Sequence, residues 1–117
     1  MTYREFVVPA DREFVEQLGV EPAAVEDAEA AGQFEVAVGD DVLDFTFDVH
    51  GRSIRCLWSR GDRVLLDVFR EGATRLTVYA TEGETHLRTE FETDSLSGYL
   101  DIRVFPTIGF EDSLLLV

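Results

Sequence analysis

Few side chains of this 117-residue sequence are suited to catalysis near neutral pH, and the three that stand out are His50, His86 and Cys56. A stable zinc site needs about four ligands brought together, whereas the two histidines fall on separate predicted strands. Cys56 takes an apolar strand position, where a buried thiol is inert. As the only cysteine, it can form no intrachain disulfide. We predict no metal site, no cofactor and no catalytic residue.

The remaining motifs also fail to indicate an enzyme. Residues 51–55, Gly-Arg-Ser-Ile-Arg, do not match the Gly-x-Ser-x-Gly turn that exposes a nucleophilic serine. The sequence contains no phosphate-binding P-loop, no G-x-G-x-x-G and no H-E-x-x-H. The spacing of Asp40, Asp41 and Asp44 lacks the alternating ligands and central glycine of a calcium loop. This spacing favours a solvated acidic turn.

Charge is the strongest signal in the composition. Acidic residues outnumber basic ones by 24 to 10, every basic residue is arginine, and the formal net charge is -14. This charge disfavours direct contact with the phosphates of nucleic acid. Two interpretations stay open: a surface that docks on a basic protein, or an adaptation to a high-GC genome or to salt that serves solubility.

The sequence also suggests where the protein resides. No apolar run approaches the ~20 residues of a membrane span, and residues 1–10 lack the pattern of a secretory signal. We expect a cytoplasmic protein that contacts no membrane.

A single domain is expected over residues 1–117, beginning with short elements. Residues 2–8 alternate loosely between apolar and polar and could form a first strand. Asp11 at an N-cap position, followed by Phe14, Val15 and Leu18 on one helical stripe, predicts a short helix that ends at Gly19. A proline followed by alanine and glutamate predicts a second helix over residues 22–31.

From Phe34 onward the apolar period changes to two, which is typical of half-buried strands. Glycines recur at a spacing that matches one strand and a tight turn: Gly51, Gly61, Gly72 and Gly83. The predicted fold class is α+β. In it, two short N-terminal helices pack on a strongly twisted antiparallel β-meander of about seven to eight strands, which could close partly into a barrel.

Matching apolar residues across neighbouring strands gives a register for each hairpin. The register pairs Phe47 with Cys56, Cys56 with Leu66, Leu66 with Val78, Val78 with Leu87, and Phe91 with Ile102. All these residues are expected on one inner face.

The same register defines rows on the outer face. One row is charged, and cross-strand ion pairing is its expected role: Asp48, Arg55, Asp67 and Arg88. The next row is apolar and aromatic although it lies on the solvent side: Leu57, Leu65, Tyr79 and His86. Three readings remain open. The helices cover this row, a protein partner binds it, or a barrel uses one face to line a ligand cavity.

The function we predict is non-catalytic. The protein would be an interaction module of the inhibitor, immunity or antitoxin kind that binds a basic protein through its charge and the outer apolar row. The alternative is a small barrel or half-barrel that binds an apolar ligand. The sequence is compatible with a monomer or a homodimer.

Overall fold

The computed structural model describes residues 4–116 and contains one helix and nine strands in this range. The helix is α1 (Asp11–Leu18). The strands are β1 (Ala23–Val25), β2 (Ala28–Val38), β3 (Asp41–Asp48), β4 (Ser53–Arg60), β5 (Arg63–Glu71), β6 (Ala73–Thr81), β7 (Glu84–Glu92), β8 (Leu96–Phe105) and β9 (Gly109–Leu116). The predicted combination of helix and antiparallel strands is confirmed in outline, with one helix in place of two.

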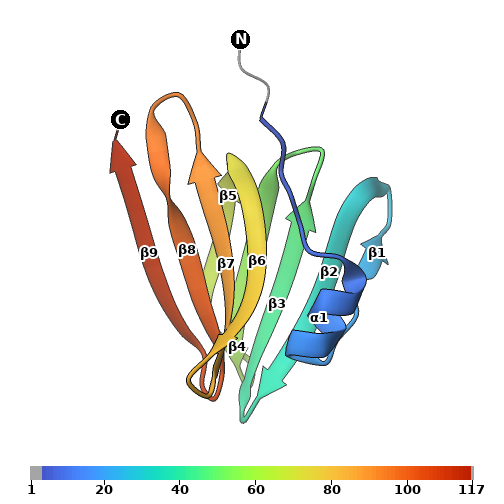
Figure 1. The fold of residues 1–117 in the computed structure, drawn as a ribbon. Helices are drawn as coiled ribbons and strands as arrows, with labels where there is room; N and C mark the ends of the chain where they lie inside the picture. Colours follow the sequence, from blue (N-terminus) through green and yellow to red (C-terminus); the bar gives the residue numbers. More distant parts are fainter. Residues whose placement is uncertain (1–3, 117) are drawn as a thin grey trace.

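The strands form two antiparallel sheets instead of one meander. The first sheet has the order β1-β2-β3-β4-β5, and the second has the order β6-β7-β8-β9. Figure 1 shows the second sheet in front and to the left of the first. The chain passes between the sheets at Gly72, whose φ of 89° suits glycine. The structure is not a closed barrel, which corrects that part of the prediction.

The core lies between the facing sides of the two sheets. In the first sheet it is supplied by cross-strand rows such as Phe34, Phe45 and Cys56. The second sheet contributes the buried side chains Leu76, Val78, Leu87, Ile102 and Val104. Helix α1 lies on the inner side of the first sheet, where the rings of Phe14 and Phe47 stack with centroids 5.7 Å apart. The helix therefore completes the core and does not cover the outer side of either sheet.

The second predicted helix, over residues 22–31, is wrong. The segment holds β1 and the start of β2, joined by a turn at Asp27. Helix propensity is a weak preference, and pairing with a neighbouring strand overrides it here. Gly32, directly after this segment, pairs with Phe47 in the sheet, where a Cβ atom would collide with the phenyl ring.

The predicted first strand, over residues 2–8, is absent as a strand in its described part. Val7 makes an isolated bridge to Arg75 of β6, with its amide donating to the Thr74 carbonyl. Residues 2 and 3 lie outside the described residues. No helix within residues 4–116 is long and apolar enough to cross a membrane.

In the second sheet, the predicted register is right for one hairpin and shifted for the next. Val78 pairs with Leu87 as predicted. Phe91 pairs with Gly98 instead of Ile102. Because the shift is an even number of residues, the same side chains still face inward.

In the first sheet, Phe47 pairs with Ile54 instead of Cys56, and Cys56 pairs with Val68 instead of Leu66. These shifts also preserve the inward-facing side. The predicted pair of Leu66 with Val78 is wrong for a different reason, because β5 and β6 belong to different sheets.

Candidate functional site

The row predicted to bind a partner is divided between two faces. Leu57 of β4 and Leu65 of β5 lie on the outer side of the first sheet, which we name the first face. Tyr79 of β6 and His86 of β7 are paired on the outer side of the second sheet, which we name the second face. The break between β5 and β6 separates them. The prediction of one continuous row is therefore wrong. The charged row is divided in the same way, with Asp48, Arg55 and Asp67 on the first face and Arg88 on the second.

Asp101 is the centre of the second face. Its side chain is only 5% exposed although it points to the outer side of β8. Oδ2 accepts hydrogen bonds from the Tyr79 hydroxyl at 2.6 Å and from Arg88 Nε at 2.8 Å. Oδ1 lies 2.6 Å from His86 Nδ1, and the rings of Tyr79 and His86 stack with centroids 5.0 Å apart. Three side chains from two strands thus enclose one carboxylate.

This enclosure shifts the pKa of the acidic groups. Burial favours the neutral acid, but hydrogen bonds from Tyr79, His86 and Arg88 outweigh it and lower the pKa of Asp101. Burial, together with the bond to this carboxylate, raises the pKa of Tyr79 to about 12. Asp101 is consequently ionised and Tyr79 is a neutral donor at physiological pH.

His86 has a carboxylate at each ring nitrogen. Asp101 lies at Nδ1, and Oε1 of Glu84 lies 3.0 Å from Nε2. Burial opposes a charged ring, but the hydrogen bonds to these two carboxylates raise the pKa of His86 above its usual value. His86 therefore stays an imidazolium to a higher pH than a free histidine does.

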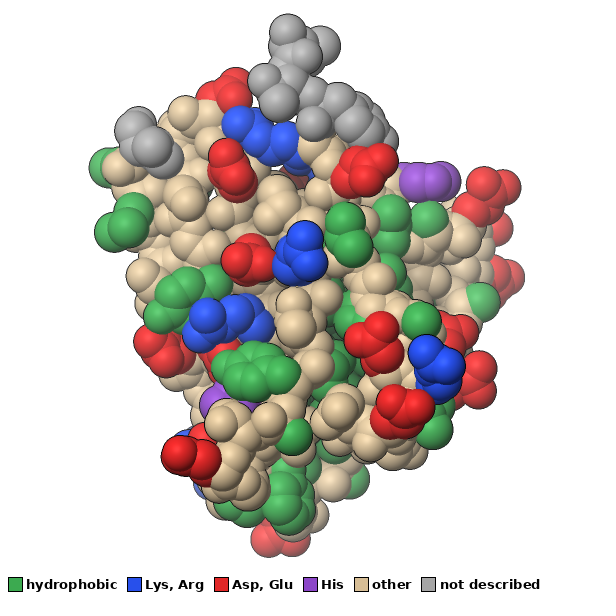
Figure 2. Space-filling view, viewed as in Figure 1, with side chains coloured by type: hydrophobic (Ala, Val, Ile, Leu, Met, Phe, Trp, Pro, Cys, Tyr) green, Lys and Arg blue, Asp and Glu red, His purple; other side chains and the backbone are tan. Residues whose placement is uncertain are grey.

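Other charged groups of the second face also have partners. Arg88 lies over the ring of Tyr99, 4.2 Å from its centroid, and the Tyr99 hydroxyl donates to Glu111. Arg103 lies 3.7 Å from Glu84. Figure 2 looks onto this side and shows arginine and acidic side chains beside one another over the second sheet. The charges of the second face largely neutralise each other.

The first face has a different balance, because the outward positions paired across β2 to β5 carry five carboxylates and one arginine. The carboxylates are Glu35, Asp44, Asp48, Asp67 and Glu71, and the arginine is Arg55. Arg55 donates to both oxygens of Asp67, at 3.2 and 3.0 Å, and hydrogen bonding from this side chain is the main reason that the pKa of Asp67 is lowered. Arg55 and Asp67 thus form a cross-strand ion pair on the first face.

Among residues 4–116, the other carboxylates of the first face either accept hydrogen bonds from uncharged donors or have no hydrogen-bond partner. Asp44 accepts from the side-chain amide of Gln33, and Asp48 accepts from the backbone amide of Gly51. Most of the negative charge on this face is therefore not neutralised by a cation.

Large apolar side chains are exposed among these charges. Phe69 is 63% exposed and Leu65 is 38% exposed. Leu65 is the extra residue of a β-bulge, at which β5 has one more residue than β4. Half-buried Leu57 lies between Asp44 and Asp67 in one cross-strand row. The first face thus combines apolar groups with uncompensated negative charge.

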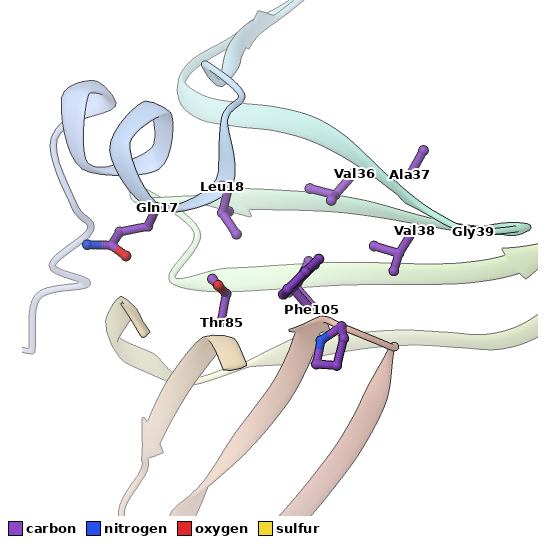
Figure 3. Close-up of a pocket in the computed structure, with 10 residues that line it drawn as sticks. Gln17, Leu18, Val36, Ala37, Val38, Gly39, Thr85 and Phe105 are labelled. Carbon is purple, nitrogen blue, oxygen red and sulfur yellow. The ribbon is translucent and has the colours of Figure 1, made fainter. Parts of the chain in front are cut away.

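A groove of about 390 Å³ opens between the two sheets beside α1. Its lining is mainly apolar: Leu18, Val36, Val38, Val104, Phe105 and Pro106, with Gln17 and Thr85 as polar members. Figure 3 shows Leu18 and Val38 directed toward Phe105, whereas Ala37 points away. The groove has the volume and lining of a small-molecule site.

The remaining residues considered from sequence lie elsewhere. Cys56 is fully buried, and burial raises the pKa of its thiol to about 12. His50 lies in the turn after β3. Asp41 is buried instead of solvated, because it accepts from Arg60 at 2.6 Å and from the Trp58 indole at 3.2 Å. Within residues 4–116 no three His, Cys, Asp or Glu side chains are grouped to hold a metal ion.

Sequence reasoning does not identify Asp101. The predicted register of the last hairpin is shifted by four residues, so it does not bring Arg88 opposite Asp101, as the structure does. The available signal was an acidic residue at an outward position between the buried Leu100 and Ile102. That signal is shared by many solvated carboxylates.

No protein-family model matches the chain, and no curated protein matches its sequence. Among solved structures, a chain of the contact-dependent growth inhibition toxin–immunity protein complex from Klebsiella pneumoniae 342 has a similar fold, with a TM-score of 0.81 and 18% sequence identity. The match covers 92% of this chain and 96% of that chain. The two-sheet fold described here therefore also occurs in a chain of that complex.

Proposed function

We propose that this protein is a non-catalytic interaction module of the immunity kind that neutralises a basic protein by binding it. The observation that carries the proposal is the charge of the chain, with 24 acidic and 10 basic residues. The similar fold of a chain in a toxin–immunity protein complex supports it. In this proposal the protein and its partner meet in the cytoplasm.

The charge has a specific consequence for binding. A strongly negative protein attracts a basic partner before contact and so accelerates association. Added salt screens this attraction, because the Debye length falls from ~10 Å at 0.1 M to ~3 Å at 1 M ionic strength. The association rate should therefore fall steeply with salt, while dissociation changes much less.

The test begins with a tagged form of the full chain produced in its native cell and cross-linked there. The captured partner is identified by mass spectrometry, and its association rate is measured between low and high salt. A basic partner whose association slows at least tenfold supports the proposal. A neutral or acidic partner, or a rate that salt does not change, would exclude an electrostatic role for the charge.

The four residues that the sequence predicts to bind a partner form two separate groups. Leu57 and Leu65 belong to the first face, and Tyr79 and His86 belong to the second. The two faces point away from each other across the core, so a compact partner engages one of them. Which face it engages is a separate question.

Binding of a small apolar ligand is a second candidate function, and the groove between the sheets favours it. Its volume of about 390 Å³ lies in the range of ~300–1,000 Å³ that is typical of ligand pockets. Decanol, a neutral probe that the acidic surface does not repel, should shift the NMR signals of Leu18, Val36 and Val38. A Val38→Trp variant, which fills the groove, should abolish these shifts. Unchanged spectra of the wild-type protein at saturating decanol would rule out this function.

A further inference from the structure

We infer that the basic partner docks on the first face, across β3, β4 and β5, and leaves the second face free. This inference rests on the proposed function and adds to it the surface and the chemistry of the partner. The partner presents arginine or lysine side chains alternating with apolar ones. Such a segment matches what the first face offers.

The first argument is the exposed apolar surface. Phe69 is 63% exposed, and Leu65 is placed outward by the bulge in β5. The row that contains Leu57 runs directly beside the row that contains Phe69. Apolar side chains clustered on a solvent-facing sheet and bordered by charge are typical of a binding surface. A partner that covers them removes this apolar area from water.

The second argument is electrostatic complementarity. The carboxylates at Glu35, Asp44 and Glu71 have no arginine, lysine or histidine partner among residues 4–116. A cation supplied by a partner therefore displaces no existing ion pair there. On the second face, a new cation would compete with Arg88 and His86 for Asp101. Docking on the first face is the less costly arrangement.

The third argument is size. Strands β2 to β5 each have at least eight residues. With a strand spacing of ~4.8 Å and a rise of ~3.3 Å per residue, the whole first face has a projected area of roughly 500 Å². This area is of the same order as the ~800 Å² per partner of a standard interface. A partner centred on β3, β4 and β5 therefore fits on the first face by itself.

A peptide probe tests the location directly. The probe is acetyl-Arg-Leu-Arg-Phe-Arg-Leu-Arg-amide, which presents basic and apolar side chains on opposite sides when extended. It is titrated into the ¹⁵N-labelled full chain. We expect the largest amide shifts in β3, β4 and β5. Shifts concentrated in β7 and β8, or spread evenly over both sheets, would overturn the inference.

Two variants with matched exposure provide the control. Phe69→Ser removes an apolar group of the first face, and Leu115→Ser removes one from β9 of the second sheet, where Leu115 is 67% exposed. Both side chains lie mostly in water, so neither change should unfold the protein, which circular dichroism checks. We expect Phe69→Ser to weaken peptide binding at least tenfold and Leu115→Ser to leave it within twofold. Equal effects would overturn the inference.

The same variants separate this inference from the proposed function when they are measured against the captured partner. Loss of partner binding in Phe69→Ser, but not in Leu115→Ser, supports both. The reverse pattern with a basic partner overturns the docking surface and leaves the proposed function standing. A captured partner that is not basic overturns the proposed function, whatever the peptide does.

Discussion

The two outer faces of this sandwich carry the same kinds of charged residue in different arrangements. On the second face, Asp101 is buried beneath Tyr79, His86 and Arg88, and each contact joins two groups of the same sheet. On the first face, five carboxylates lie around a single arginine, Arg55. The difference teaches that net charge by itself does not determine the electrostatic field outside a face. What determines it is whether each carboxylate already has a cationic partner.

The arrangement also decides what each face contributes. A cluster in which each carboxylate has a cationic partner produces little electrostatic field beyond its own contacts. The interactions within it stabilise the fold. Uncompensated carboxylates in water stabilise the fold little, but their field reaches an approaching partner. We therefore expect substitutions on the second face to change stability, and substitutions on the first face to change binding.

The largest effect is expected for Asp101→Ala. The change leaves Tyr79, His86 and the partly buried Arg88 without their shared acceptor, so the unfolding free energy should fall by about 3–5 kcal/mol. Asp67→Ala is the matched control on the first face and should cost much less, because both Asp67 and Arg55 are exposed to water. Urea denaturation measures both. Similar losses in the two variants would remove the contrast between the faces.

A smaller loss is expected for Tyr79→Phe, which deletes one hydroxyl donor to Asp101. A hydrogen bond to a charged group contributes about 1.5–3 kcal/mol, and the unfolding free energy should fall in that range. Tyr99→Phe deletes the bond to the more exposed Glu111 and should cost less. Thermal and urea unfolding compare the two variants. A larger loss for Tyr99→Phe would show that Asp101 is not the centre of the cluster.

The contribution of His86 should depend on pH. Its pKa is raised in the folded state, so its added stability is fully present below the unfolded value of ~6.5 and is lost as pH rises through the folded pKa. The neutral ring keeps a bond to Asp101 but turns a lone pair toward Glu84. His86→Gln should therefore destabilise the protein more at pH 5.5 than at pH 8.5. A pH-independent difference in urea midpoints would contradict this assignment.

The smallest change in stability is expected for Arg55→Gln. Loss of this exposed ion pair should change the unfolding free energy only slightly, because water screens both charges. Because the first face then has no arginine on its strands, affinity for the basic peptide should rise. Isothermal titration calorimetry measures the affinity. Weaker binding would indicate that Arg55 contacts the partner.

For most strand positions, but not for the exposed Val64 and Leu116, the sequence predicts which side faces inward. Phe45, Cys56 and Leu87 are buried where the alternation places them, although several pairings are shifted. The reason is physical: side chains alternate with a period of two, so an even shift in register leaves the buried set unchanged. The alternation thus determined the faces without determining all the partners.

The break between the sheets could not be predicted. Gly72 has the same spacing and chemistry as the glycines of true hairpins, so no local signal distinguishes it. The break comes from long-range packing, including the contact of Trp58 with Phe110 across the core. The division of the outer row depends on such packing, whereas the cluster at Asp101 was missed because the register of the last hairpin was predicted four residues away from the observed one.

One measurement tests the contrast between the faces most directly. Two variants lose equal charge: one by glutamine or asparagine at Glu35, Asp44 and Glu71 of the first face, the other by glutamine at Glu90, Glu92 and Glu111 of the second. The affinity of each for the basic peptide is measured at the same ionic strength. We predict at least a tenfold loss for the first-face variant and less than a twofold loss for the other. Equal losses would mean that net charge, and not its arrangement, governs binding.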